Sequence, residues 1–253
     1  MLTIENLSVR YGKKEVLSAV STHIEKERIT AIVGKNGSGK STLLSCLTGT
    51  VAYTGSIQLN GTPLQTLPPK ERAKKISLMP QLLPDTALTV QQLALLGRSA
   101  YLGFAGRYSN ADTAAVANAL QLAQMESFAD RSVQKLSGGE RQRAFLAMLL
   151  AQDTPLMAFD EPTAHLDTTA AAAFENCLRM LVQKEKKTVL VVSHDLSAAA
   201  NLADTILCLH EGRLVFAGTT KKFTDSQTAE SIFGVRKTFF TDSDGCQRVL
   251  YYR

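Results

Sequence analysis

A buried-strand pattern, Ile29–Val33, runs directly into Gly34-Lys35-Asn36-Gly37-Ser38-Gly39-Lys40-Ser41, and a helical stretch, Thr42–Leu47, follows. This stretch matches G-x-x-x-x-G-K-[ST], a pattern that arises by chance in roughly one chain in a hundred of this length. Glycines let backbone N–H groups approach phosphate oxygens, and the amino terminus of a helix adds a positive dipole end. A Gly-Ser turn that binds nothing would need neither the strand nor the helix. The sequence therefore predicts a phosphate-binding loop in an α/β protein.

Two side chains of this loop carry the expected chemistry. Lys40 places a positive charge on the β- and γ-phosphates of a nucleotide, and the Ser41 hydroxyl is positioned to ligate Mg²⁺. A nucleoside triphosphate with Mg²⁺ is the ligand that such a loop holds.

The surrounding chain alternates strands and helices. Leu156–Phe159 and Thr188–Val192 are almost entirely apolar and each precedes a helical pattern, as buried parallel strands do. The first ~60 residues differ, because Leu2–Val9, Val16–Ile24 and Ser56–Leu59 are half-polar strands joined by turn signals. We expect a core with a mostly parallel sheet and flanking helices, together with an N-terminal antiparallel β-subdomain.

Between residues 82 and 151 the strand pattern disappears and helical composition takes over. The helical segments are Thr89–Leu96, Ala111–Gln124 and Gly138–Leu150. The sequence thus predicts a helical subdomain, 82–151, inserted into a core formed by 1–81 and 152–253.

Two hairpins are expected near the C-terminus. The first joins Ile206–Leu209 to Leu214–Phe216 through Glu211-Gly212. The second lies within Phe239–Tyr252 around Asp244-Gly245.

Polar side chains follow the apolar strands. Asp160 ends Leu156–Phe159 and can reach Mg²⁺, while Glu161 comes next and can polarise a water molecule that attacks the γ-phosphate. His194 follows Thr188–Val192 and is a candidate γ-phosphate contact. Gln81 follows the strand-like Ile76–Met79, and its amide can ligate Mg²⁺ or hold the attacking water. Each residue alone would pass as a cap or a surface side chain; the phosphate loop makes them candidates together.

A second glycine motif, Leu136-Ser137-Gly138-Gly139-Glu140, opens the helical run that follows it. A Ser-Gly-Gly at a helix start creates another anion-binding amino terminus. One chain needs only one γ-phosphate site, so this motif is expected to serve the ATP of another subunit. In isolation it would pass as a helix cap with a glycine turn.

With these motifs the sequence resembles the ABC ATPase family over about residues 1–225. Leu136–Glu140 is similar to the family signature, Gly34–Ser41 to its Walker A, Leu156–Asp160 to its Walker B, Gln81 to its Q-loop, His194 to its H-loop, and Ala164-His165-Leu166-Asp167 to its D-loop. Tyr11 matches the aromatic residue that stacks on adenine. The D-loop departs from the common Ser-Ala-Leu-Asp at Ala164 and His165.

The resemblance implies an active ATPase that works as a head-to-tail homodimer with ATP and Mg²⁺ between the subunits. The implied catalytic residues are Glu161 as general base, His194 and Gln81, and the implied metal residues are Ser41, Gln81 and Asp160. The implied nucleotide contacts are Tyr11, Gly34, Asn36, Gly37, Ser38, Gly39, Lys40, Ser41 and Thr42, with Ser137, Gly138 and Gly139 from the other subunit.

One branch of the family fits best. Leu95–Arg98 and Tyr101–Arg107 resemble a segment of the ATPases of iron-siderophore, haem and cobalamin importers, although Ala100 stands where those often have proline. The C-terminal hairpin is similar to theirs as well. The implied partners are integral-membrane permease subunits and a substrate-binding protein. The protein would then lie on the cytoplasmic face of the cell membrane as a peripheral subunit.

Composition narrows the alternatives. The chain has 253 residues, 45% of them hydrophobic, and no apolar run of the ~20 residues that a membrane helix needs. Its net charge of +5 comes from basic clusters without interleaved aromatics, which favours a solvated surface over a nucleic-acid site. The four scattered cysteines predict buried free thiols. A soluble ABC ATPase of iron–sulfur cluster assembly remains the main alternative; the segment Gly97–Arg107 argues against it.

The same segment suggests how the ATPase contacts a permease. Tyr101, Leu102 and Phe104 are apolar in a region expected at the edge of the domain, and exposed apolar groups there commonly mark a partner surface. The alternative is that they pack within the helical insertion.

Overall fold

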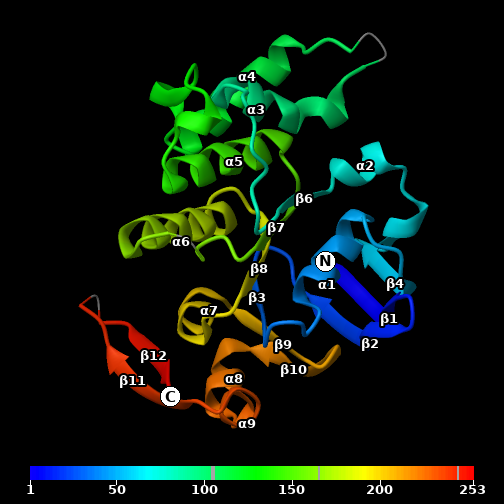
Figure 1. Ribbon diagram of the computed structural model, residues 1–253, viewed down its shortest axis with the longest axis vertical. Coiled ribbons are helices and arrows are strands. Elements are labelled where there is room, and N and C mark those ends of the chain that lie inside the picture. Colours follow the sequence, from blue (N-terminus) through cyan, green and yellow to red (C-terminus); the bar gives the residue numbers. More distant parts are fainter. Residues whose placement is uncertain (104–105, 165, 244) are drawn as a thin grey trace. The chain divides into compact units, whose positions relative to one another are not determined.

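The computed structural model describes residues 1–103, 106–164, 166–243 and 245–253. The predicted features at Phe104, His165 and Asp244 lie outside these ranges. The described chain divides into two compact units. Figure 1 shows the chain coloured from blue at the N-terminus to red at the C-terminus. The first unit comprises Met1–Thr66 and Leu181–Arg253, and the second comprises Leu67–Met180.

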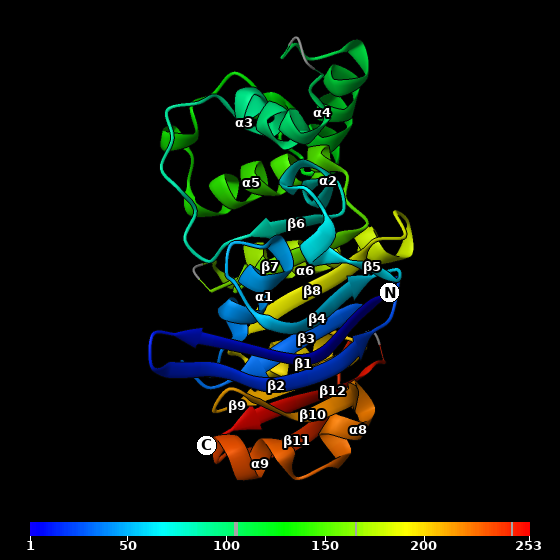
Figure 2. The same ribbon diagram turned by 90° about the vertical axis from the view of Figure 1, so that its right-hand side faces the viewer.

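The first unit contains an antiparallel sheet in the strand order β2-β1-β4-β5 (Figure 2). Its strands are β1 (Leu2–Tyr11), β2 (Lys14–Ile24), β4 (Thr54–Leu59) and β5 (Thr62–Pro63), followed by the 3₁₀ turn η1 (Leu64–Thr66). In β1, Leu2 lies opposite Ile24 of β2 on one side and opposite Leu59 of β4 on the other. Alternate apolar residues of these strands are buried, as the period of two dictates. The predicted N-terminal antiparallel β-subdomain is confirmed.

The same unit contains a parallel strand group in which β3 pairs with β8 on one side and with β9 on the other. The elements are β3 (Ile29–Gly34), α1 (Lys40–Thr48), β8 (Thr188–Ser193), α7 (Leu196–Leu202), β9 (Thr205–His210) and β10 (Arg213–Thr219). Every residue of β3 is buried, which explains why its sequence is apolar except at Thr30. Glu211 and Gly212 both have positive φ, at 48° and 76°, and join β9 to β10 as the predicted hairpin.

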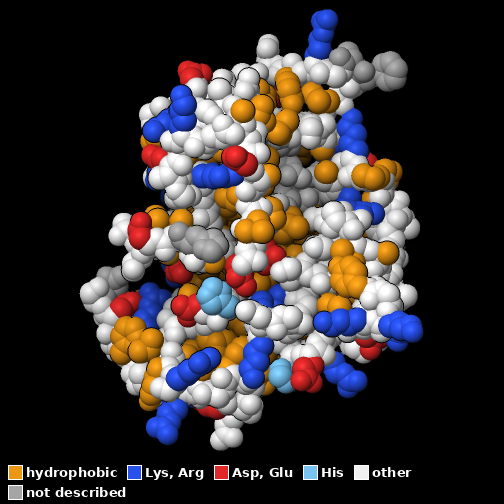
Figure 3. Space-filling view, viewed as in Figure 1, with side chains coloured by type: hydrophobic (Ala, Val, Ile, Leu, Met, Phe, Trp, Pro, Cys, Tyr) orange, Lys and Arg blue, Asp and Glu red, His pale blue; other side chains and the backbone are white. Residues whose placement is uncertain are grey.

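The C-terminal elements are α8 (Thr220–Asp225), α9 (Thr228–Phe233), β11 (Arg236–Thr241) and β12 (Gln247–Tyr252). β11 and β12 form the second predicted hairpin. The outer edge of β12 is capped by α7, because the Asn201 side chain donates to the Val249 carbonyl at 2.9 Å and accepts from the Val249 N–H at 3.0 Å. Phe239 and Phe240 are exposed on β11. Figure 3 shows hydrophobic side chains gathered at the lower left, where Figure 1 places the β11–β12 hairpin.

The second unit combines two strands with the helical insertion. Its elements are α2 (Pro69–Ala73), β6 (Ile76–Met79), α3 (Val90–Leu96), η2 (Gly97–Tyr101), α4 (Asn110–Leu122), η3 (Glu126–Phe128), η4 (Val133–Lys135), α5 (Gly138–Gln152), β7 (Leu156–Asp160) and α6 (Thr168–Gln183), the last of which ends in the first unit. β6 and β7 pair in parallel. The three predicted helices correspond to α3, α4 and α5 within one or two residues at each end, and Thr89, Ser109 and Ser137 cap them. The α/β fold class with a helical insertion is confirmed.

The segment Gly97–Leu102 is more buried than we expected. The Tyr101 hydroxyl donates to the Gln152 carbonyl at 3.0 Å, and its ring centroid lies 3.6 Å from the Arg98 guanidinium carbon. Arg98 in turn bonds Asp112 and the Ala151 carbonyl, both at 2.9 Å. These contacts satisfy the last carbonyls of α5, which have no intrahelical partner. Tyr101 therefore packs against α5, and both Tyr101 and Leu102 are half-buried, so their predicted exposure is right only in part.

The thiol prediction is right in part. All four cysteines are free, and Cys46 and Cys208 are buried, but Cys177 is half-buried and Cys246 is exposed. Burial raises the pKa of Cys46 to about 12, so that thiol stays protonated. Among the described helices, none is long and apolar enough to span a membrane.

Candidate nucleotide-binding site

The predicted phosphate loop connects β3 to α1 in the first unit. Gly37 and Gly39 have φ of 78° and 100°, which only glycine adopts without strain. A Cβ on Gly34 would lie 2.4 Å from both the Leu209 carbonyl oxygen and the Ser38 hydroxyl oxygen. The glycines therefore allow a tight turn that any side chain would prevent.

Lys40 is held in place by backbone carbonyls of the loop itself. Its ammonium donates to the carbonyls of Gly34 at 2.8 Å and Lys35 at 3.2 Å, and only 6% of the residue is exposed. The Ser38 hydroxyl is buried and has no hydrogen-bond partner among the described residues. The amino terminus of α1 has no side-chain cap, so its N–H groups are available. A buried hydroxyl, a positioned cation and an uncapped helix fit a polyphosphate.

Other predicted nucleotide residues of this unit lie on the surface around the loop. Asn36 and Ser41 are exposed and Thr42 is half-buried. Tyr11 ends β1 with 52% of its surface exposed, as an aromatic platform for a flat base would be.

The parallel pairing of β3 with β8 places His194 at the same sheet edge. Val33 lies opposite Ser193, the last residue of β8, so His194 follows at the edge where Gly34 ends β3. The turn is fixed by its neighbours, because the Asp195 N–H donates to the Ser193 hydroxyl at 3.1 Å and Asp195 caps α7. The exposed imidazole is thus at the carboxyl ends of the strands, where ligands bind in open α/β sheets.

The second unit brings two predicted catalytic residues together. β6 and β7 run in register, with Met79 opposite Phe159, so Gln81 and Glu161 emerge at one edge. The Gln81 amide donates to the Glu161 carboxylate at 2.9 Å. Glu161 has a positive φ of 49°, an uncommon conformation that sets where its side chain emerges after the strand. Asp160, the last residue of β7, is 8% exposed.

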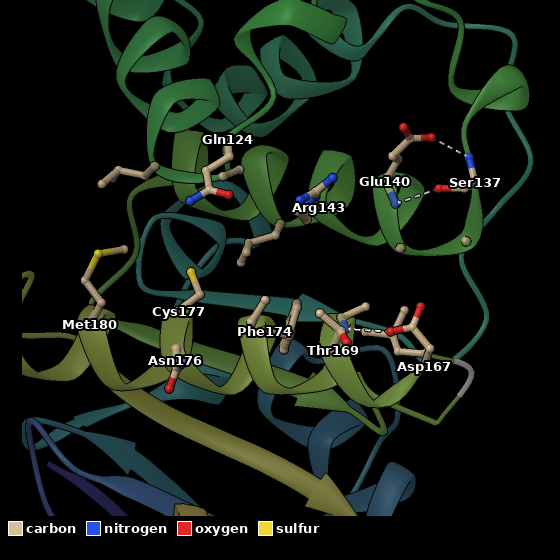
Figure 4. Close-up of a pocket in the computed structure, with 18 residues that line it drawn as sticks. Gln124, Ser137, Glu140, Arg143, Asp167, Thr169, Phe174, Asn176, Cys177 and Met180 are labelled. Atoms are coloured by element: carbon tan, nitrogen blue, oxygen red, sulfur yellow. Dashed lines mark hydrogen bonds between the residues drawn. The ribbon is translucent and has the colours of Figure 1, made fainter. Parts of the chain in front are cut away.

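The signature segment, Leu136–Glu140, begins helix α5 with a capping box. The Glu140 N–H donates to the Ser137 hydroxyl at 3.4 Å, and the Ser137 N–H donates to the Glu140 carboxylate at 2.7 Å (Figure 4). The hydrogen bond from the Ser137 backbone lowers the pKa of Glu140, which keeps the cap ionised. Ser137 and Gly138 are exposed, and a Cβ on Gly138 would meet nothing. This helix start can therefore face another molecule.

Arg141, which no sequence motif marks as functional, connects two of these motifs. The Arg141 guanidinium donates to the carbonyls of Leu83 at 3.2 Å and Pro84 at 2.7 Å. It also lies 3.5 Å from the Asp85 carboxylate. The segment after Gln81 is thereby tied to the signature helix. No local sequence pattern predicts this contact, because the partners of Arg141 are backbone oxygens more than fifty residues away in the sequence.

The loop, the strand edges and the parallel pairing define a P-loop nucleotide-binding protein. The model of the ABC transporter family matches residues 17–164, and the chain belongs to this family. It is 36% identical over 240 residues to the ferric enterobactin transport ATP-binding protein FepC of Escherichia coli, covering 94% of this chain and 89% of that one. It is 35% identical over 244 residues to the petrobactin import ATP-binding protein FpuD of Bacillus anthracis, covering 95% and 89%.

Among solved structures, the chain is similar to a dimeric post-hydrolysis state of the ATP-binding cassette MJ0796 bound to ADP and phosphate. The TM-score is 0.75 at 28% identity, and the match covers 87% of this chain and 99% of that one. As a member of this family the chain is an ATPase that binds ATP. Cassettes of the family dimerise, and its import subunits work with membrane permeases.

Proposed function

We propose that this protein is the ATP-hydrolysing subunit of an importer for an iron-siderophore, haem or cobalamin-type substrate, acting on a separate permease. The observation that carries the ATPase function is the phosphate loop with a buried, pre-positioned Lys40. The cargo class is supported by the names of FepC and FpuD, which align with nearly the whole chain. A substrate-binding protein completes the complex, and the subunit lies on the cytoplasmic face of the cell membrane.

The proposed assembly is a homodimer with two ATP molecules at its interface. Each ATP is held by the loop residues Gly34, Asn36–Thr42 and by Tyr11 of one subunit. The exposed helix start at Ser137, Gly138 and Gly139 of the other subunit meets the γ-phosphate. The proposal is supported by the capping box, which keeps this helix start rigid, and by the absence of any Cβ at Gly138. We propose 82–151 as the helical subdomain, with 1–81 and 152–253 as the ATP-binding core.

In the proposed reaction, the oxygen of a water molecule attacks the γ-phosphorus. Glu161 accepts a proton from this water molecule as the new bond forms. The bond between the γ-phosphorus and the bridging oxygen breaks, and the electron pair leaves with ADP. The Gln81 amide orients the carboxylate through their 2.9 Å hydrogen bond. His194 donates to a γ-phosphate oxygen, and Lys40 holds the β- and γ-phosphates. Ser41, Gln81 and Asp160 would hold Mg²⁺, which supplies positive charge to the phosphate oxygens.

Ser137→Arg should block ATP-dependent dimerisation while each monomer still binds ATP. The new side chain places bulk against the partner's γ-phosphate, but the subunit's own phosphate loop is intact. Sedimentation velocity with Mg-ATP in a Glu161→Gln background measures the effect. Ser127→Arg is the matched control, because Ser127 is an exposed serine of η3 outside every motif. A Ser137→Arg dimer as abundant as the control's would refute the role of this helix start in trans.

Uptake measurements test the proposed cargo. In the source organism, deleting the gene should abolish uptake of one of three labelled substrates: a ferric siderophore, haem or cobalamin. The wild-type gene should restore uptake and the Glu161→Gln gene should not. Activity of an iron–sulfur enzyme, measured under iron-replete conditions, provides the contrast. Normal uptake of all three substrates with a loss of iron–sulfur enzyme activity would instead identify an assembly factor.

A further inference from the structure

A cavity of about 850 Å³ lies between helices α5 and α6 of the second unit. One end is formed by Ser137, Glu140 and Asp167, and the other by Gln124, Cys177 and Met180 (Figure 4). Its size falls within the range of pockets that hold small organic ligands, about 300–1,000 Å³. Ser137, Gly138 and Gly139 at the signature end belong to the proposed dimer interface, whereas no role assigned above uses the part of the cavity from Arg143 to Met180.

The walls of the cavity combine apolar side chains with polar ones that include Thr169 and Asn176. Leu146 of α5 lies on one side, and Ala170, Phe174 and Met180 of α6 lie on the other, with Leu166 near the signature end. At the far end, Gln124 contributes an uncharged amide. Such a lining favours the body of an apolar ligand, and a few polar groups then decide its orientation.

Arg143 is the polar group between the two ends. Its guanidinium lies between Gln124 and Glu140 in Figure 4, and its Nε is buried. Within the described parts of the chain this Nε has no acceptor, and Arg143 forms no ion pair. Arg143 as a whole is half-buried, so its guanidinium can be reached from the cavity, and an anion arriving there gains a charge-assisted hydrogen bond.

The neighbouring carboxylates are already engaged. Glu140 accepts from the Ser137 N–H at 2.7 Å, and Asp167 accepts from the Ala170 N–H at 2.8 Å. Both lie at the signature end and serve the amino termini of their own helices. Arg143 is therefore left to a ligand, although its charge also contributes to lowering the pKa of Glu140.

We propose that this cavity binds a small organic carboxylate with an apolar body. The carboxylate accepts from Arg143, and the apolar body extends along α6 toward Cys177 and Met180. The charge at Arg143 selects anions over neutral or cationic molecules of the same shape. None of the residues that line the cavity belongs to the phosphate loop or to the Gln81–Glu161 pair, so we expect the ligand to bind without nucleotide.

Isothermal titration calorimetry on the full chain, without nucleotide, tests the proposal with decanoate, decanol and decylammonium. We expect decanoate to bind best and decylammonium to bind worst. Arg143→Gln should weaken decanoate binding by about ten- to a hundredfold, the value of one charged hydrogen bond, and leave decanol unchanged. Equal affinities for the three compounds, or no saturable binding of decanoate, would overturn the proposal.

A pair of α6 variants locates the binding. Ala173 lines the cavity and Ala172 does not, and both are exposed on the same helix. Ala173→Phe should abolish decanoate binding, whereas Ala172→Phe should bind as the parent does. Should Ala173→Phe misfold by circular dichroism, alkylation of Cys177 in the parent gives a second readout by mass spectrometry. Decanoate should slow it, and identical rates with and without decanoate would refute the site.

Discussion

Glu161→Gln should lower kcat for ATP hydrolysis by about 10²- to 10⁴-fold, the usual contribution of a general base. An amide cannot accept the proton of the attacking water, so the chemical step fails while nucleotide binding remains. The geometry supports a specific effect, because glutamine can still accept from the Gln81 amide through its own oxygen. The variant should therefore keep the arrangement of the site and lose only its chemistry.

Single-turnover hydrolysis measures this loss, with ATP affinity measured in parallel. Glu185→Gln is the matched control, since it makes the same chemical change at an exposed position. In the presence of Mg-ATP, Glu161→Gln should also accumulate as a dimer, because hydrolysis no longer opens it. A variant that hydrolyses ATP at the rate of the Glu185→Gln control would show that another group takes the proton.

Lys40→Ala should weaken ATP binding by about 2–5 kcal/mol, the cost of truncating one partner of a hydrogen-bonded charge pair. This corresponds to a loss of roughly 30- to several-thousand-fold in affinity. Lys40 is buried and held by the Gly34 and Lys35 carbonyls. Its side chain therefore loses little conformational entropy when a nucleotide binds. Lys40→Ala therefore removes a positive charge whose position the fold already fixes.

Titration with ATP by calorimetry measures the affinity, and circular dichroism verifies that the variant folds. Lys35→Ala is a stringent control, because Lys35 is a lysine of the same loop whose side chain is exposed. If charge in the loop were all that mattered, the two variants would lose similar affinity. We expect a large loss at Lys40 and a small one at Lys35, and equal losses would contradict the assigned role.

Local features of this protein were determined by its sequence. The phosphate loop, the Glu211-Gly212 turn and the Ser137–Glu140 capping box each depend on residues within a few positions of one another. Steric limits on φ, the demand for a capped helix and the burial of an apolar strand act over that range. The α/β class, the antiparallel subdomain and the helical insertion follow from the same periodicities.

Contacts between distant residues were decided by the tertiary structure. The parallel register of β6 and β7 creates the hydrogen bond between Gln81 and Glu161, and the packing of η2 on α5 brings the Tyr101 hydroxyl to the Gln152 carbonyl. Arg141 meets the segment after Gln81, and Arg143 is left facing a cavity, although both are arginines of one helix turn. The sequence places both arginines on the helix, but which acceptors reach each of them depends on chain segments that approach from elsewhere. Such long-range pairing is set by the global packing of the core, and no local pattern records it.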